Sequence, residues 1–199
     1  MLHTVLGKKS PDDLFHEEVT AVIEASKSLV TYFKQTTLQN RLKKTLKACV
    51  ETRWNSLHTM LDSILSQYDD VGDILAERGE QNRLINLSRD VLGDLVSFLA
   101  RFRDATKALE ASKTPTLHLT AVWIERLRTH LQPATSDSMA LGSLKKKALE
   151  VLNQKLELHP LHKMAVFLHP KLKSLKLLPK DDVTVVYGEA RRLVQGKSK

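Results

Sequence analysis

The sequence is poor in the residues that interrupt helices and in the one that forms cross-links. Its 199 residues include only seven glycines, six prolines and one cysteine. So few helix breakers over this length favour long helices over many short strands. The single cysteine, Cys49, excludes a disulfide framework within the chain and favours a reducing compartment, since extracellular domains of this size more often carry paired cysteines.

Long apolar runs are also missing. No run approaches the roughly 18 residues that a membrane-spanning helix needs, and the segment from Met1 to Ser10 lacks the apolar stretch of a signal peptide. Hydrophobic residues make up 42% and charged residues 27% of the chain, which is typical of a folded globular protein rather than a disordered one. We therefore expect a folded intracellular chain with no membrane partner.

Motifs for catalysis and metal binding are absent as well. The sequence has no HExxH, no CxxC and no glycine-rich phosphate loop. Cys49 has no histidine at a familiar spacing, and the pairs Asp69-Asp70 and Asp181-Asp182 cannot face each other on a helix because their members are adjacent. His159 and His162 could share a helix face toward zinc, but no cysteine or carboxylate has a matching spacing. We expect no metal and no cofactor.

Positive charge is concentrated toward the C-terminal end. Residues 1–140 carry 18 basic and 18 acidic residues, whereas residues 141–199 carry 13 basic and 5 acidic residues and so account for the whole net charge of +8. This asymmetry indicates an anionic partner near the C-terminal end, with a solvated lysine-rich surface as the alternative. The candidate contacts with DNA in this region are five lysines: Lys145, Lys146, Lys147, Lys171 and Lys173.

Apolar residues recur at helical spacing along most of the chain. The pattern predicts helices over residues 11–34, 38–49, 54–77, 84–109, 115–131, 137–157, 160–168, 170–177 and from 180 onward. The β-rich stretch Val183–Tyr187 follows Pro179 and Asp181, which are helix-start signals, so a helix is predicted there too. We expect an all-α bundle of long amphipathic antiparallel helices in one domain, 1–199, with two sub-bundles, 1–112 and 113–199, as the finer alternative.

Arg53-Trp54 offers a planar cation beside a flat ring at the predicted start of a helix. Such a pair can stack on an unpaired base and hold a phosphate group. The structural alternative is that Trp54 begins the apolar stripe of the helix and that Arg53 pairs with a nearby acid. The residues themselves leave both interpretations open.

Four sequence blocks follow one another in residues 29–177. They are Leu29–Gln35, Glu51–Ser56 just ahead of Met60-Leu61, Pro115–Leu119 just ahead of Trp123, and Ala165–Lys173. The last three resemble the segments TRWNS…ML, PTLHLVLPW and ATFLDPRFK of the hAT superfamily of transposases, and the first resembles the helix that precedes them. That superfamily includes active transposons and domesticated relatives such as the BED-finger (ZBED) proteins.

The resemblance implies a place within a larger fold. In the family, an RNase H-like domain holds an Asp-Asp-Glu triad that binds two divalent metals, and a large helical domain is inserted between the second Asp and the Glu. Leu2–Leu6 resembles the end of the family's HTLNLVV element, which lies beyond the second Asp. We therefore expect this chain to cover most of the insertion and none of the triad, and we assign it no catalytic carboxylate.

The resemblance also bears on two sites. It implies that Trp54 stacks on a base of a flipped or hairpin DNA end and that Arg53 contacts a phosphate or supports the ring. In the last block His169 stands where the family has Asp, and Lys171 stands where it has Arg. The departure puts the Asp–Arg contact of the family in doubt and indicates a relic or domesticated copy.

The function expected from the sequence is that of a non-catalytic helical domain of a hAT-derived nuclear protein, with a DNA-associated or transcription-related role. One alternative is a fragment of an active DDE-type transposase. Another is a helical protein–protein interaction module with no role at DNA. The expected partners are DNA, another protein or a second copy of the chain.

Overall fold

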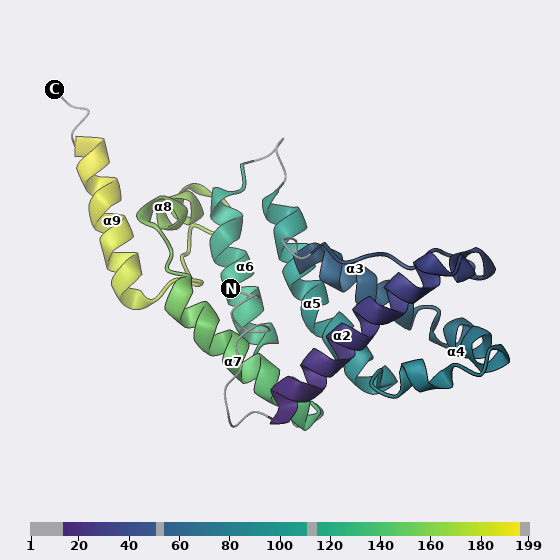
Figure 1. Cartoon of the computed structure of the whole chain (residues 1–199). Helices are drawn as coiled ribbons and strands as arrows, with labels where there is room; N and C mark the ends of the chain where they lie inside the picture. The colour runs from purple at the N-terminus through teal and green to yellow at the C-terminus, as the bar shows by residue number, and fades with distance from the viewer. Residues whose placement is uncertain (1–13, 51–53, 111–114, 196–199) are drawn as a thin grey trace. The chain divides into compact units, whose positions relative to one another are not determined.

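Helices are the regular structure of this chain. The computed structural model describes residues 14–50, 54–110 and 115–195, and within these ranges it contains no strand (Figure 1). The described elements are α2 (Leu14–Gln35), η1 (Leu38–Arg41), α3 (Trp54–Leu65), α4 (Tyr68–Glu77), η2 (Gln81–Leu84), α5 (Arg89–Leu109), α6 (Leu117–His130), α7 (Met139–Lys155), α8 (Pro160–Leu168) and α9 (Lys180–Gln195). The predicted all-α class is confirmed.

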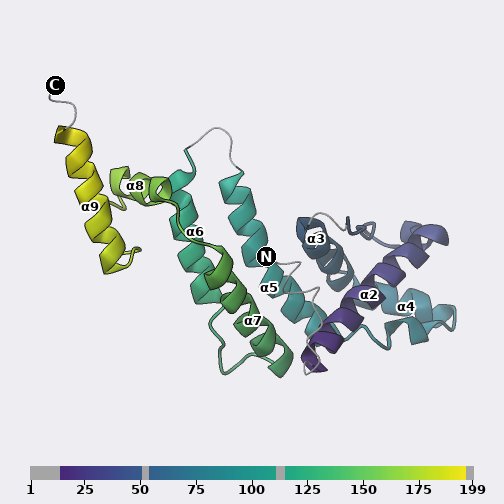
Figure 2. The same ribbon diagram turned by 60° about the vertical axis from the view of Figure 1, so that its left-hand side comes forward.

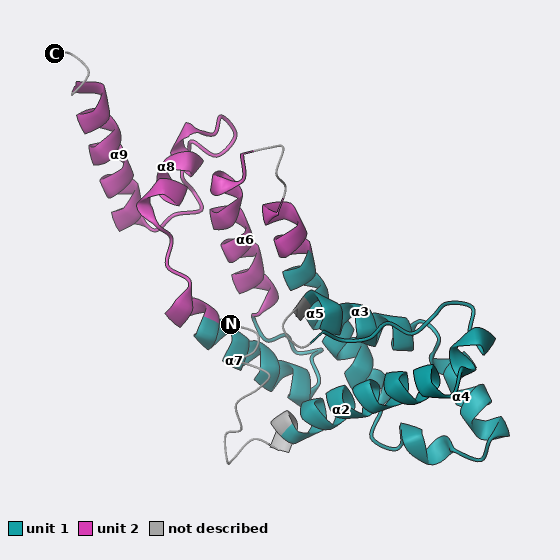
Figure 3. Cartoon of the chain, turned by 45° about the horizontal axis from the view of Figure 1, so that its top comes forward, with its two compact units in different colours: residues 1–103, 132–151 teal, residues 104–131, 152–199 magenta. Residues whose placement is uncertain are grey.

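The chain forms two compact units that interleave along the sequence (Figure 3). Unit 1 comprises residues 1–103 and 132–151, and unit 2 comprises residues 104–131 and 152–199. The expectation of a single domain, or of two sub-bundles divided after residue 112, stays a prediction.

The core of unit 1 is built from the apolar stripes of its helices. Helix α2 packs against α3, η1 and η2, and α3 packs against α4. The stripes recur every three or four residues, so each helix turns one face inward. The largest fully buried side chains of this core are Leu29, Phe33, Leu46, Met60, Leu61, Ile64, Leu75, Leu87, Leu92, Leu95, Phe98 and Leu99.

The single helix predicted over residues 54–77 is wrong, because the helix is broken between α3 and α4. Gln67 leaves helical geometry, with φ −131° and ψ 25°. Its side chain is buried, with 6% exposed, and its amide Nε2 donates to the carbonyl of Ser63 at 3.3 Å. The apolar stripe continues through the break with Val71, Ile74 and Leu75, which is why periodicity did not reveal it.

The helix predicted over residues 38–49 is also wrong. Only the short 3-10 helix η1 forms there, after Thr37 has taken a left-handed conformation with φ 58°. Residues 42–50 then run without regular structure back to the start of α3 (Figure 1). Leu42 and Leu46 are both buried and lie four residues apart, so they imitate the spacing of a helix face.

Unit 2 is organised around α8. Helix α8 packs against α6 and α9, and Figures 1 and 2 both show it between them. A small apolar cluster joins these elements, with Ala121, Val166, Leu175, Leu178 and Val186 buried in it. The helix predicted for Val183–Tyr187 is confirmed, since this stretch lies within α9. The helix predicted over residues 170–177 is wrong, because that segment forms successive turns.

Candidate nucleic-acid interface

Arg53-Trp54 falls at the edge of the described chain. The backbone of Trp54 begins α3, while Arg53 and the side chain of Trp54 lie outside the described residues. The role assigned to this pair therefore stays a prediction.

The lysines of α7 differ in how far they are available to a ligand. The Nζ of Lys145 lies 2.7 Å from the Oδ1 of Asp137, and the two side chains are only 11% and 8% exposed. Lys146 is exposed, and Lys147 is half-buried. Lys145 is thus held in an ion pair inside unit 1, and Lys146 is the lysine of this group that faces solvent.

Lys171 and Lys173 lie in the turns that follow α8, in unit 2. Both are exposed, as is Lys176 in the same turns. The backbone of this segment is held by its own hydrogen bonds, from Leu172 and Lys173 N–H to the carbonyl of His169 and from Leu175 N–H to the carbonyl of Leu172. These lysines therefore form a group separate from those of α7, which belong to unit 1.

His169 takes part in a contact between two of the sequence blocks. Its ring stacks on that of His118, with 4.2 Å between the ring centroids and 21° between their planes. Desolvation first, and then the positive charge that His169 can carry, hold the pKa of His118 below its ordinary value. At this block His169 stacks on His118, and Lys171 is exposed.

His159 serves the local structure of α8. It is the N-cap of the helix, and its Nδ1 accepts a hydrogen bond from the N–H of Leu161 at 3.2 Å. Its ring meets that of His162 edge-on, with 6.3 Å between centroids. Among the described residues, no three His, Cys, Asp or Glu side chains gather as ligands for a metal ion.

The neighbouring acids are divided among different cations. Asp69 receives two hydrogen bonds from the guanidinium of Arg89, at 2.8 and 3.3 Å. Asp70 pairs with Lys43 at 3.3 Å. In unit 2, Asp182 pairs with Lys163 at 2.6 Å. Each of these carboxylates therefore has a cation of its own in the folded chain.

Residues 42–50, here called the lysine segment, form a basic surface that the sequence did not reveal. Three of their side chains, Lys43, Lys44 and Lys47, are exposed, and no acidic residue occurs in the segment. The sequence does contain a signal for this surface, namely three lysines within five residues. The signal was not used because a helix was predicted over these residues. The segment belongs to unit 1 and leads into the Arg53-Trp54 pair.

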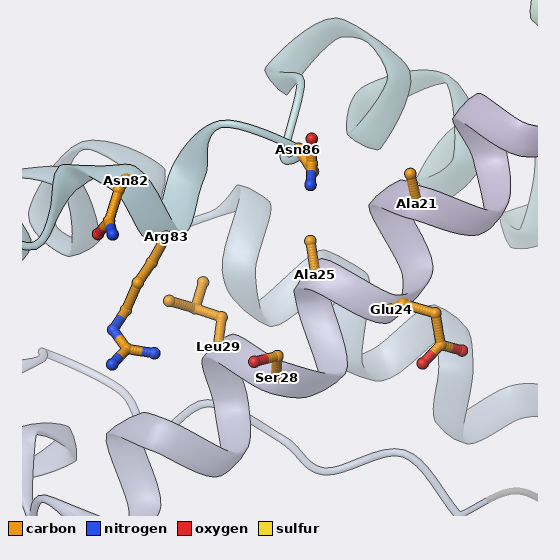
Figure 4. Close-up of a pocket in the computed structure, with 8 residues that line it drawn as sticks. All are labelled: Ala21, Glu24, Ala25, Ser28, Leu29, Asn82, Arg83 and Asn86. Carbon is orange, nitrogen blue, oxygen red and sulfur yellow. The ribbon is translucent and has the colours of Figure 1, made fainter.

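A hollow of about 510 Å³ lies between α2 and the η2 region of unit 1 (Figure 4). Small side chains of α2, Ala21 and Ala25, lie on one side, and Asn82 and Asn86 lie on the other. The charged groups at its rim are already paired within the protein. Glu24 pairs with Lys27 at 3.0 Å, and Arg83 lies over the ring of Tyr32, 3.7 Å from its centroid, while its Nε lies 2.6 Å from Glu80.

The sequence of this chain is similar to parts of a transposase and of a zinc finger protein. The chain is 30% identical over 161 residues to the transposable element Hobo transposase of Drosophila melanogaster, covering 80% of this chain. It is 26% and 25% identical over 126 residues to zinc finger protein 618 of Mus musculus and Homo sapiens. This chain is hAT-transposase-like. No family model matches it.

The hAT-like chain corresponds to only part of each relative. It spans 24% of the Hobo transposase and 13% of zinc finger protein 618. In the part that the structure describes, no helix is long and apolar enough to pass through a bilayer.

Proposed function

We propose that this chain is a non-catalytic helical part of a hAT-transposase-derived nuclear protein and that it binds DNA. The observation that carries the proposal is the match to the Hobo transposase over 80% of the chain, taken with exposed lysines that have no acidic partner. A DNA-binding role follows from the chemistry of these lysines, because neutralising phosphates releases counterions and favours association.

The described contacts proposed for DNA are Lys146 of unit 1 and Lys171 and Lys173 of unit 2. All three are exposed, and none has a carboxylate within ion-pair distance in the described chain. Lys147 is half-buried and contributes less, and Lys145 is neutralised by Asp137. Arg53 and Trp54 are retained in the proposal on their resemblance to the family motif.

The non-catalytic part of the proposal rests on the resemblance to the family, in which the helical insertion carries none of the Asp-Asp-Glu triad. A two-metal site needs carboxylates that converge on the ions, whereas Asp69, Asp70 and Asp182 bind three different cations. An active transposase fragment is the competing interpretation. It predicts Mg²⁺-dependent cleavage of transposon-end DNA once the chain is joined to the remaining segments of its protein.

The test of DNA binding is the salt dependence of affinity for a short duplex and for a hairpin, measured by fluorescence anisotropy. Contact with about five phosphates gives a slope of about −4.5 in a plot of log K against log salt concentration. A chain that binds neither probe at low salt is not a DNA-binding protein in this form.

A specific observation favours a second candidate, a helical interaction module. Two large apolar side chains that helix α9 leaves exposed, Val185 at 64% and Leu193 at 53%, are eight residues apart and so lie on the same side of the helix. Exposed apolar side chains gathered on one element are a feature of protein–protein contacts. Self-association measured by analytical ultracentrifugation, and its loss in Val185→Ser/Leu193→Ser, would favour this candidate.

A further inference from the structure

The lysine segment is held against α3 and the residues that follow it by hydrogen bonds from its backbone N–H groups to side chains. The N–H of Lys44 donates to the Oε1 of Gln67 at 2.8 Å, and the N–H of Lys47 donates to the Oγ of Ser63 at 3.0 Å. At the far end, the N–H of Val50 donates to the Oγ of Ser56 at 2.8 Å, and that hydroxyl returns a hydrogen bond to the carbonyl of Val50.

The order of these hydrogen bonds gives the direction and extension of the segment. As residue numbers rise from Lys44 to Val50, their partners fall from Gln67 to Ser56, so the segment runs antiparallel to α3. The seven helical steps from Ser56 to Ser63 rise about 10.5 Å. The three steps from Lys47 to Val50 reach the same length, about 10 Å, only when the chain is nearly extended. The segment is thus a fixed and nearly extended track over its second half.

Apolar anchors complete this attachment. Leu46 is only 2% exposed and Leu42 8%, so both side chains point into unit 1. The lysines between and beside them are left on the outer side, and the side chain of Lys43 is 82% exposed. The attachment uses backbone N–H groups and leucines, and the lysine side chains stay exposed.

The charge of this track is only partly neutralised by the protein. Lys43 has Asp70 at 3.3 Å. Lys44 has no ion-pair partner within the described residues, and the Nζ of Lys47 contacts only the hydroxyl of Thr45, at 3.3 Å. The segment therefore presents two unneutralised ammonium groups and one weakly paired group within five residues, without aromatic or amide groups between them that would read a base.

We infer that the lysine segment, through Lys43, Lys44 and Lys47, binds the phosphate backbone of a nucleic acid strand without base specificity. Flexible ammonium groups are suited to this because they act as point charges and impose little geometry on the phosphates. The partner is DNA, in keeping with the proposed function on which this inference rests. The contact is distinct from the basic residues of the C-terminal third that the sequence pointed to.

The inference is tested with Lys44→Gln/Lys47→Gln, measured by fluorescence anisotropy on a short oligonucleotide, single-stranded and as a duplex, over a range of salt concentrations. Both substitutions leave the backbone N–H groups, and so the hydrogen bonds to Gln67 and Ser63, in place. The salt slope should fall in magnitude by about 1.8 on duplex DNA or about 1.4 on a single strand. Affinity at about 0.1 M salt should fall by tens of fold.

The matched control is Lys34→Gln/Lys107→Gln, which removes two exposed lysines from α2 and α5 and should change the slope by much less. Lys44→Arg/Lys47→Arg keeps both charges and should keep the slope. If the unaltered chain binds DNA but Lys44→Gln/Lys47→Gln binds with the same slope, the inference is wrong and the proposed function stands. If the unaltered chain binds no DNA, both are wrong.

An acidic protein partner is the remaining outcome. If Lys44→Gln/Lys47→Gln weakens binding to poly-glutamate and leaves DNA binding unchanged, the segment is a site for acidic peptides, and the inference of a nucleic acid contact is overturned. Circular dichroism of each variant should match that of the unaltered chain, because neither lysine side chain is buried.

Discussion

Two segments of this chain are alike in composition and differ in how their backbones are hydrogen-bonded. The lysine segment of unit 1 and residues 169–179 of unit 2 are both non-helical, each carries three exposed lysines, and each is anchored by two buried leucines. In residues 169–179 the backbone hydrogen bonds are local, as in the bond from Leu178 N–H to the carbonyl of Leu175. In the lysine segment, the N–H groups of Lys44, Lys47 and Val50 bind side chains that lie 23, 16 and 6 residues further along the chain.

The backbone that carries exposed lysines can thus be held by hydrogen bonds within its own segment or by side chains of another element. In residues 169–179 local turns join neighbouring residues of the segment, and two leucines anchor it in the core of unit 2. The backbone of the lysine segment is held by the side chains of Ser56, Ser63 and Gln67, so its lysines keep their places only while unit 1 is folded. Net charge counted along the sequence favoured the C-terminal third, where Lys145 and Lys163 are neutralised by carboxylates. Net charge gave no sign of the lysine segment, because the basic and acidic residues of residues 1–140 are equal in number, although residues 42–50 contain three lysines and no acid.

The largest effect is expected on stability, when a buried leucine that anchors either segment is shortened. Leu46→Ala removes a side chain that is 2% exposed, and Leu175→Ala removes one that is 1% exposed. Each should lower the free energy of unfolding of its own unit by about 2–5 kcal/mol, since the cavities collapse only in part. Urea denaturation checks both, and Val50→Ala, at a half-exposed position, should change stability by less than about 0.5 kcal/mol.

The second effect is on DNA affinity. Lys171→Gln/Lys173→Gln should reduce the salt slope on duplex DNA by about 1.8 if both side chains contact phosphates. Combined with Lys44→Gln/Lys47→Gln, the reductions should add, because the two groups belong to different units and share no partner. Anisotropy titrations of the single, double and combined variants check this. A combined variant no weaker than either pair alone would mean that the two segments do not act on the same DNA.

The third effect is on the backbone of the lysine segment alone, because only that segment is held by the side chain of Gln67. Gln67→Leu removes the acceptor for the N–H of Lys44 and should destabilise the lysine segment by about 1 kcal/mol. Hydrogen exchange of the amides of residues 42–50 should then become faster, while that of residues 169–179 stays unchanged. Equal acceleration in both segments would show that the substitution unfolds the chain rather than releasing one segment. Gln35→Leu, at an exposed position, is the control.

The smallest effect is a pH dependence of unit 2. Because the folded pKa of His118 lies below its ordinary value, the unfolded chain takes up a proton near about pH 6.5 before the folded chain does. Stability is therefore complete above the unfolded pKa and is lost as pH falls below about 6.5. Urea denaturation at about pH 5.5 and 7.5 measures this window.

His169→Asp should reverse that dependence. A carboxylate beside His118 raises the folded pKa of the histidine. The added stability is then fully present below the unfolded pKa and is lost as pH rises through the raised folded pKa. A variant that keeps the original direction would show that the stacked pair does not control the titration.

Much of the fold was predictable from the sequence because most helices carry their own signals. The predicted ranges 137–157 and 160–168 agree closely with α7 and α8. Cap signals at Pro179 and Asp181 correctly overrode the β-branched composition of the start of α9. Capping and periodicity are local, so they can be read without the tertiary structure.

The errors lie where distant groups decide the backbone. Leu42 and Leu46 have helical spacing, but the N–H groups of Lys44 and Lys47 bind side chains of residues 63 and 67 instead of carbonyls four residues earlier. No pattern within residues 38–49 contains that information. The site shows the same limit, since Lys145 reaches eight residues back to Asp137, across the start of α7, for its ion pair.

We propose that this hAT-like chain binds the phosphate backbone of DNA, and the salt dependence of its affinity for DNA decides whether it does. Anisotropy titrations of the unaltered chain with duplex DNA should give a log–log slope of about −4 to −5, which corresponds to about five phosphate contacts. Binding with a slope near zero, or no binding at low salt, would contradict the claim.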